Sequence, residues 1–150
     1  MPVIKKVFIV IGIFLVILIV GYAGINLFGW SIYNSNSCER FNIDNIELRT
    51  GTNIPFISEC DCNLGNNTKY VVFQFSPGVN VNEYIVRNKF EKYQSDIAIS
   101  FEDFPGFDTN LLSDAESLFF KKGKNERNGD NWEMILDKGK LWIKLQYGEK

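Results

Sequence analysis

Three cysteines carry the most distinctive chemistry in this 150-residue sequence. In an oxidising compartment two of them can form a disulfide, and the odd count then leaves one thiol free. Cys60 and Cys62 are two positions apart, so in a strand both lie on one face, where a bond between them would be strained. The sequence therefore predicts a disulfide from Cys38 to either Cys60 or Cys62.

The remaining thiol is either a reactive group or a buried, inert one. Glu59 and Asp61 flank Cys60, and nearby carboxylates disfavour the thiolate that a nucleophile needs. Because free cysteines are most often buried, we expect a buried and unreactive thiol. The C-x-C spacing also differs from the redox motif C-x-x-C, and the sequence lacks the fourth ligand of a structural zinc site.

The absence of histidine narrows the chemistry further. Ser-His-Asp and Cys-His catalysis and the H-E-x-x-H zinc site are excluded within this chain. Glu102, Asp103 and Asp108 form an acidic group that would suit a metal ion or a pair of catalytic carboxylates, but no calcium-loop pattern accompanies them. We therefore predict no cofactor, no metal site and no catalytic residues.

Aromatic side chains are interspersed with these acidic residues. Phe101, Phe104 and Phe107 surrounded by charge have the composition of a protein-interaction surface. Trp142 falls on the face of a predicted strand opposite Leu141 and Ile143. This tryptophan is either an exposed anchor or a packed side chain in a sheet that is covered on both faces.

The only basic cluster spans residues 121–127. It is either a solvated hairpin loop or a contact for an acidic partner or anionic lipid headgroups. Together with the aromatic residues, it completes the predicted partner surface, which comprises Phe101, Phe104, Phe107, Trp142, Lys121, Lys122 and Lys124.

An apolar N-terminal segment precedes all of these residues. Residues 7–30 carry no charge and are long enough to cross about 30 Å of hydrocarbon as a helix. Lys5 and Lys6 lie before this span, and Arg40 is the first basic residue after it. The positive-inside rule then predicts a cytoplasmic N-terminus (1–6), a transmembrane helix (7–30), a linker (31–37) and an extracytoplasmic domain (38–150).

Two other interpretations of the apolar segment remain open. A cleaved secretory signal would use the small residues around Ala23, although the apolar run continues to Phe28. A lipoprotein signal would place its lipid on Cys38. However, this cysteine follows Asn36 and Ser37, where such a signal has a leucine and small residues next to the apolar core.

Beyond the apolar segment, the chain is mildly acidic. It holds 14 of the 16 basic residues and all 18 acidic ones, a net charge of −4. This charge argues against binding to nucleic acid, which needs clustered Lys and Arg.

The periodicity of apolar residues predicts an α+β fold. It indicates helices at about 38–50 and 80–93, a hairpin of strands at 56–64 and 70–75, and three closing strands. Capping-box spacing at Asp44–Glu47 and a terminating Gly51 support the first helix, and Asn80 is the expected N-cap of the second. We expect an antiparallel sheet of about five strands packed by two helices.

Two stretches, Arg49–Pro55 and Leu141–Tyr147, resemble segments of small, uncharacterised membrane-anchored or lipoprotein-like bacterial proteins. Some proteins of this kind are proposed as immunity or envelope accessory factors. The resulting hypothesis is a non-catalytic, membrane-tethered binding module for another envelope protein, since a tether raises its local concentration. The alternatives are an accessory subunit that pairs through its span, or a small enzyme that uses a carboxylate or a thiol.

Overall fold

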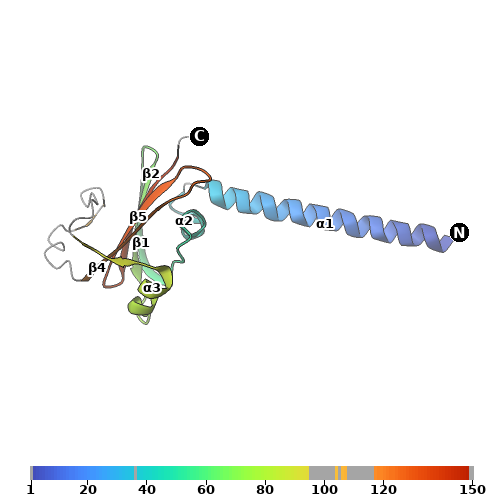
Figure 1. Cartoon of the computed structure of the whole chain (residues 1–150). Helices are drawn as coiled ribbons and strands as arrows, with labels where there is room; N and C mark the ends of the chain where they lie inside the picture. Colours follow the sequence, from blue (N-terminus) through green and yellow to red (C-terminus); the bar gives the residue numbers. More distant parts are fainter. Residues whose placement is uncertain (1, 36, 95–103, 105, 108–116, 149–150) are drawn as a thin grey trace. The chain divides into compact units, whose positions relative to one another are not determined.

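The computed structural model describes residues 2–35, 37–94, 104, 106–107 and 117–148. The chain divides into two compact units, Met1–Ser35 and Asn36–Lys150. The observed fold is α+β, as the sequence predicts: a long apolar helix, and then an antiparallel sheet with short helices (Figure 1).

The first unit is the single helix α1 (Pro2–Asn34). Its stretch Lys6–Asn34 is long and apolar enough to cross a membrane, and none of that window is buried. The predicted span 7–30 lies within it, whereas Ser31–Asn34, expected to be linker, is helical. Asn26 is the one amide side chain inside the apolar run, and its N–H donates a hydrogen bond to the carbonyl of Tyr22 (2.8 Å). Such a bond within the helix pairs a polar group that would find no partner in hydrocarbon.

The second unit is built on one six-stranded sheet. Its strands are β1 (Ile57–Gly65), β2 (Thr68–Phe75), β3 (Glu91–Lys92), β4 (Leu118–Lys124), β5 (Asn131–Asp137) and β6 (Lys140–Gln146). Their order is β1-β2-β6-β5-β4-β3, and every neighbouring pair is antiparallel. The prediction of about five strands differs only by the two-residue β3, which is too short to leave an alternating pattern.

Two short helices, α2 (Asn42–Thr50) and α3 (Val81–Asn88), accompany the sheet. α2 begins four residues later than predicted because Phe41 adopts a left-handed backbone (φ 53°) that a helix cannot include. The predicted capping box is wrong: the carboxylate of Glu47 accepts a hydrogen bond from the backbone N–H of Ile54 (2.6 Å) instead. Gly51 ends the helix in the left-handed region, as expected.

The N-cap of α3 is confirmed, because the side chain of Asn80 accepts a hydrogen bond from the backbone N–H of Glu83 (3.2 Å). The helix ends earlier than predicted, since Lys89 takes a left-handed conformation (φ 57°). Phe90 and Tyr93 therefore lie beyond the helix, and the chain there turns into β3.

One face of the sheet packs against both short helices. Ile46 of α2 and Tyr84 and Ile85 of α3 join the inward-facing residues of the central strands in a single apolar cluster. The predicted core positions of these strands are all buried there: Val71, Phe73, Phe75, Trp132, Met134, Leu136, Leu141, Ile143, Leu145 and Tyr147.

The opposite face is also covered. Trp142 and Ile135 project from it and pack with Leu118 and Phe104, and with the half-buried Val72, Tyr93 and Phe107. Of the two interpretations of Trp142, coverage of both sheet faces is the one observed, because only 2% of this side chain is exposed.

β1 forms one edge of the sheet, and it is less buried than its alternating sequence predicts. Cys60 and Cys62 lie opposite Phe73 and Val71, so they do share the helix-covered face. Most of the strand is exposed, however, and Phe56 just before it is 86% exposed. Alternation fixes which face a side chain occupies, but only a neighbouring element decides whether that face is covered.

Candidate functional site

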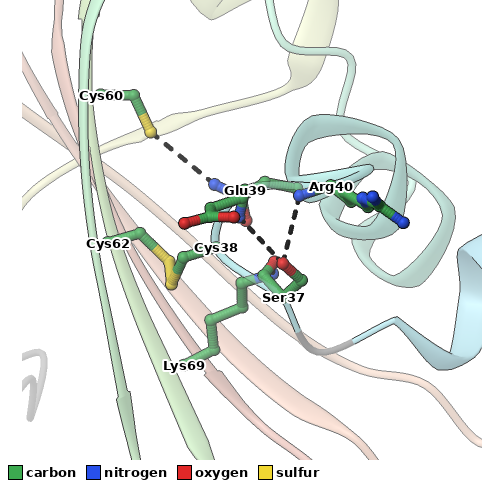
Figure 2. Close-up of a disulfide and its surroundings, with 8 residues drawn as sticks. Ser37, Cys38, Glu39, Arg40, Cys60, Cys62 and Lys69 are labelled. Atoms are coloured by element: carbon green, nitrogen blue, oxygen red, sulfur yellow. Dashed lines mark hydrogen bonds between the residues drawn. A yellow bond between two sulfur atoms is a disulfide. The ribbon is translucent and has the colours of Figure 1, made fainter.

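A disulfide joins Cys38 to Cys62, with the two Cα atoms 5.6 Å apart (Figure 2). This is one of the two predicted pairings. The hydroxyl oxygen of Ser37 accepts hydrogen bonds from the backbone N–H groups of Glu39 (3.0 Å) and Arg40 (3.1 Å), so the chain turns tightly around Cys38. The bridge thereby fixes the start of the domain to the edge strand.

Cys60 carries the free thiol, and it is exposed, so the expectation of a buried thiol is wrong. Its sulfur accepts a hydrogen bond from the side-chain amide of Asn42 (3.7 Å), at the start of α2. Partial burial raises the pKa of the thiol, Asn42 and Lys69 lower it, and the charge of Asp61 raises it. The net effect is an elevated pKa, which keeps this thiol protonated near neutral pH.

Lys69 lies on the same sheet face and is fully buried. Its ammonium donates a hydrogen bond to the carbonyl of Ser37 (3.0 Å), and Figure 2 shows the Lys69 side chain extending toward Ser37 beside the disulfide. Burial, followed by the positive charge of Arg49, lowers the pKa of Lys69 to about 8. The alternation Lys69, Val71, Phe73 would have placed this lysine on the core face, but the predicted strand began one residue later.

A buried ion pair connects α2 to the residue that precedes β5. The guanidinium of Arg49 lies against the carboxylate of Asp130, and both side chains are almost wholly excluded from solvent. The same guanidinium stacks over the ring of Tyr147, 4.7 Å from its centroid. Asp130 also accepts a hydrogen bond from the backbone N–H of Gly148 (2.9 Å). Local sequence patterns do not predict this pair, because its partners are 81 positions apart.

The aromatic part of the predicted partner surface is not exposed as a whole. Phe104 and Trp142 are buried, and the ring of the half-buried Phe107 packs edge-on against Trp142 at 5.1 Å. These three residues belong to the second apolar cluster, so they cannot act as exposed anchors. Phe101 lies outside the described residues, as do Glu102, Asp103 and Asp108.

The three predicted contact lysines lie in β4, not in a loop. Lys121 faces the helices and donates a hydrogen bond to the hydroxyl of Thr52 (2.9 Å), where burial and the charge of Lys89 lower its pKa. Lys122 and Lys124 are exposed and alternate with Lys121, so they project from the other face. The three lysines therefore form no single basic patch.

The structure instead gathers polar groups beside β1. A groove of about 230 Å³ lies on the face of the sheet opposite the helices, and Glu59 and Asp61 of β1 line it. Its remaining lining residues are Cys60, Val72, Gln74, Gly106 and Lys140. The alternation predicted for residues 56–64 puts these two carboxylates on one face of the strand, but it does not predict a groove beside them. Among the described residues, no group of three His, Cys, Asp or Glu side chains could hold a metal ion.

The backbone of β1 also has an open side. The N–H of Phe75 bonds to Gly139, next to β6, whereas the N–H of Ser76 bonds to Phe56, next to β1. Successive residues of β2 therefore alternate between its two neighbours. The backbone groups of β1 alternate in the same way. Those of Asp61 and Asn63 bond to β2, whereas the N–H and C=O groups of Cys60, Cys62 and Leu64 point away from it. In the described part of the chain, no strand pairs with that side.

Comparisons of the chain with protein-family models, curated proteins and solved structures found no match. The resemblance of residues 49–55 and 141–147 to membrane-anchored bacterial proteins therefore stays a prediction.

Proposed function

We propose that this protein is a single-pass membrane protein whose α+β domain lies outside the cytoplasm and binds another envelope protein there. The length and apolar character of α1 support a membrane span. Lys5 and Lys6 ahead of it support a cytoplasmic N-terminus. The Cys38–Cys62 disulfide agrees with an oxidising compartment for the domain.

The observation that carries the binding role is the edge of β1 that no strand of the described residues covers. This strand is nine residues long and mostly exposed. Three of its residues, Cys60, Cys62 and Leu64, direct backbone donors and acceptors outward. Unpaired edges invite the addition of another strand, and proteins usually shield them. An extended segment of a partner would continue the sheet here, with the ladder supplying affinity and the side chains specificity.

The disulfide makes this edge a better binding surface. It ties the middle of β1 to the turn that begins the domain, and β2 holds the strand on its other side. A strand that is already fixed in extended form loses little conformational freedom when a partner adds to it. Tethering by α1 would further raise the local concentration of the domain for partners in the same membrane.

The membrane assignment is tested by carbonate extraction and by a reporter fused after Lys150. The intact, uncleaved chain should stay with the membrane fraction, and the reporter should be active only outside the cytoplasm. A cytosolic reporter would overturn the proposed orientation. A shortened mature chain would indicate a secretory signal instead of a span.

The binding assignment is tested by placing a photo-crosslinking amino acid in the full-length protein in native membranes. Position 64 on the open edge should crosslink to one discrete envelope protein, whereas the exposed position Val86 on α3 serves as the control. In a second experiment the photo-crosslinking amino acid is moved to a neighbouring position of β1, and Leu64 is replaced by proline. The crosslink should then weaken, because Leu64→Pro removes an outward-pointing N–H without breaking the β1–β2 ladder. Equal crosslinking from both positions would contradict a role for β1.

Exchange of the apolar span distinguishes a tether from an accessory subunit. If α1 serves only as a tether, an unrelated span in place of residues 7–30 should preserve the crosslink from β1. Loss of the crosslink would show that the span itself recognises a membrane partner.

A further inference from the structure

We infer that the segment added to β1 is an extended stretch of a partner protein with basic side chains at alternate positions. This inference rests on the proposed function and specifies the chemistry of its partner. It follows from the side chains that border the open edge and from the groove beside them.

The outer face of β1 is acidic. Glu59 and Asp61 are both exposed, lie two residues apart and project from the same face. No basic residue occurs in β1. Both carboxylates line the groove of about 230 Å³, where Lys140 is the one cation among the described lining residues. The ammonium of Lys140 also lies over the ring of Trp142, 5.1 Å from its centroid.

The pairing of an added strand with β1 predicts which residue types the partner segment should carry at each position. Side chains of paired strands that lie opposite each other share a face. Residues opposite Glu59 and Asp61 would therefore extend over the groove, where a lysine or arginine would meet two carboxylates. Residues between them would lie beside Cys60 and Cys62 on the other face, where small or apolar side chains fit best. The partner segment should thus alternate basic and apolar residues.

The acidic residues of β1 disfavour one symmetric pairing of two copies of this chain. An antiparallel pairing of two β1 strands about Cys60 would place Glu59 of one copy opposite Asp61 of the other. Like charges directly opposite each other destabilise a pair of strands. In that register, the charge of the edge favours a different, basic chain over self-association.

The inference is tested with the full-length protein in nanodiscs of zwitterionic lipid, which do not themselves attract basic peptides. The probe is an acetylated, amidated peptide of alternating lysine and valine, and its binding is followed by fluorescence anisotropy. A peptide with glutamate in place of lysine tests the charge requirement, and one methylated at backbone nitrogens tests the ladder. We expect saturable binding of the basic probe and loss of binding for the other two.

The protein variants are Glu59→Gln/Asp61→Asn, with Glu126→Gln as a matched control for removal of an exposed carboxylate outside β1. Removing both charges should raise the Kd for the basic peptide about tenfold, since two partly exposed ion pairs are lost. The control should bind the peptide as the parent does. Added salt should weaken peptide binding by the parent and the control, but not by the double variant.

Equal binding of the acidic peptide, an unchanged Kd in the double variant, or no binding of the basic probe would each overturn the inference. Dimerisation of the parent protein through β1 would overturn it as well. If the crosslink from position 64 persists in membranes while the peptide experiment fails, the binding role stands and only the chemistry assigned to the partner is wrong. If both fail, the proposed function falls too.

Discussion

The guanidinium of Arg49 on α2 lies against the carboxylate of Asp130, the residue just before β5, with both side chains buried. This pair connects a helix near the beginning of the domain to strands near its end. Its energetic role is to neutralise two charges that the fold has removed from water. Breaking such a pair from one side is costly because the other charge is left buried without compensation.

Asp130→Asn is therefore expected to lower the free energy of unfolding by about 3–5 kcal/mol. Denaturant unfolding of the full-length protein in detergent, followed by tryptophan fluorescence, measures the change. The control is Arg87→Gln on the exposed side of α3, which should change the stability by less than about 0.5 kcal/mol. Equal effects of the two substitutions would show that the ion pair is not a structural contact.

The Cys38–Cys62 disulfide should contribute about 3 kcal/mol by closing a loop across 24 positions in the unfolded chain. The comparison is Cys60→Ser with Cys38→Ser/Cys60→Ser, so that no free thiol can replace the missing partner. The single variant should unfold at nearly the parent's denaturant midpoint, and the double variant at a lower one. A loss of stability in Cys60→Ser alone would indicate that Cys60 takes part in the native bridge.

Lys69 should make the stability depend on pH in an identifiable window. Burial lowers its pKa from 10.5 to about 8, so between these values the unfolded chain holds a proton that the folded chain lacks. The free energy of unfolding contributed by this group therefore rises with pH from about 8 to 10.5, and below that window the cost of burying the charge is fully present.

This dependence is measured as the difference in unfolding free energy between the parent and Lys69→Met at pH 7.5, 8.5 and 9.5. Groups other than Lys69 titrate in both proteins, so their contributions largely cancel in this difference. The parent should gain stability relative to the variant as the pH rises. Parallel pH profiles would mean that Lys69 keeps its ordinary pKa in the folded domain.

Gly123 in β4 should be intolerant of a side chain. A Cβ at this position would overlap the ring of Trp132, which lies opposite it in β5. Gly123→Ala should cost about 1–3 kcal/mol, because a well-packed region must shift. Gly65→Ala in β1 is the matched control: its Cβ would meet only ordinary contacts, the nearest at 3.7 Å. A similar midpoint for both variants would contradict the close packing of Trp132.

The main elements of the fold follow from local patterns in the sequence. The core positions of β2, β5 and β6 alternate regularly, and the turn between β5 and β6 has Lys138 and Gly139 at positive φ, as a two-residue hairpin requires. The late start of α2 and the early end of α3 were not predictable, because Phe41 and Lys89 adopt left-handed backbones that their residue types rarely take.

The candidate site was harder to predict than the fold. The sequence showed that Trp142 lies on the second face of its strand, but not that Phe104 and Phe107 pack against it from a distant segment. Likewise, it placed Glu59 and Asp61 on one face of β1, but it could not show that β1 is an edge strand. Strand order depends on contacts between distant segments, and local periodicity does not record them.

The position of the disulfide also sets the path of mechanical force through the domain. A pull on the N-terminal segment would reach the fold at Cys62 through the sulfur bridge, and the longer backbone route through residues 39–61 would stay slack. α2 lies within that bypassed loop. For a domain anchored by α1 and holding its partner along β1, as proposed above, tension between membrane and partner would run through the sulfur bridge and this one strand.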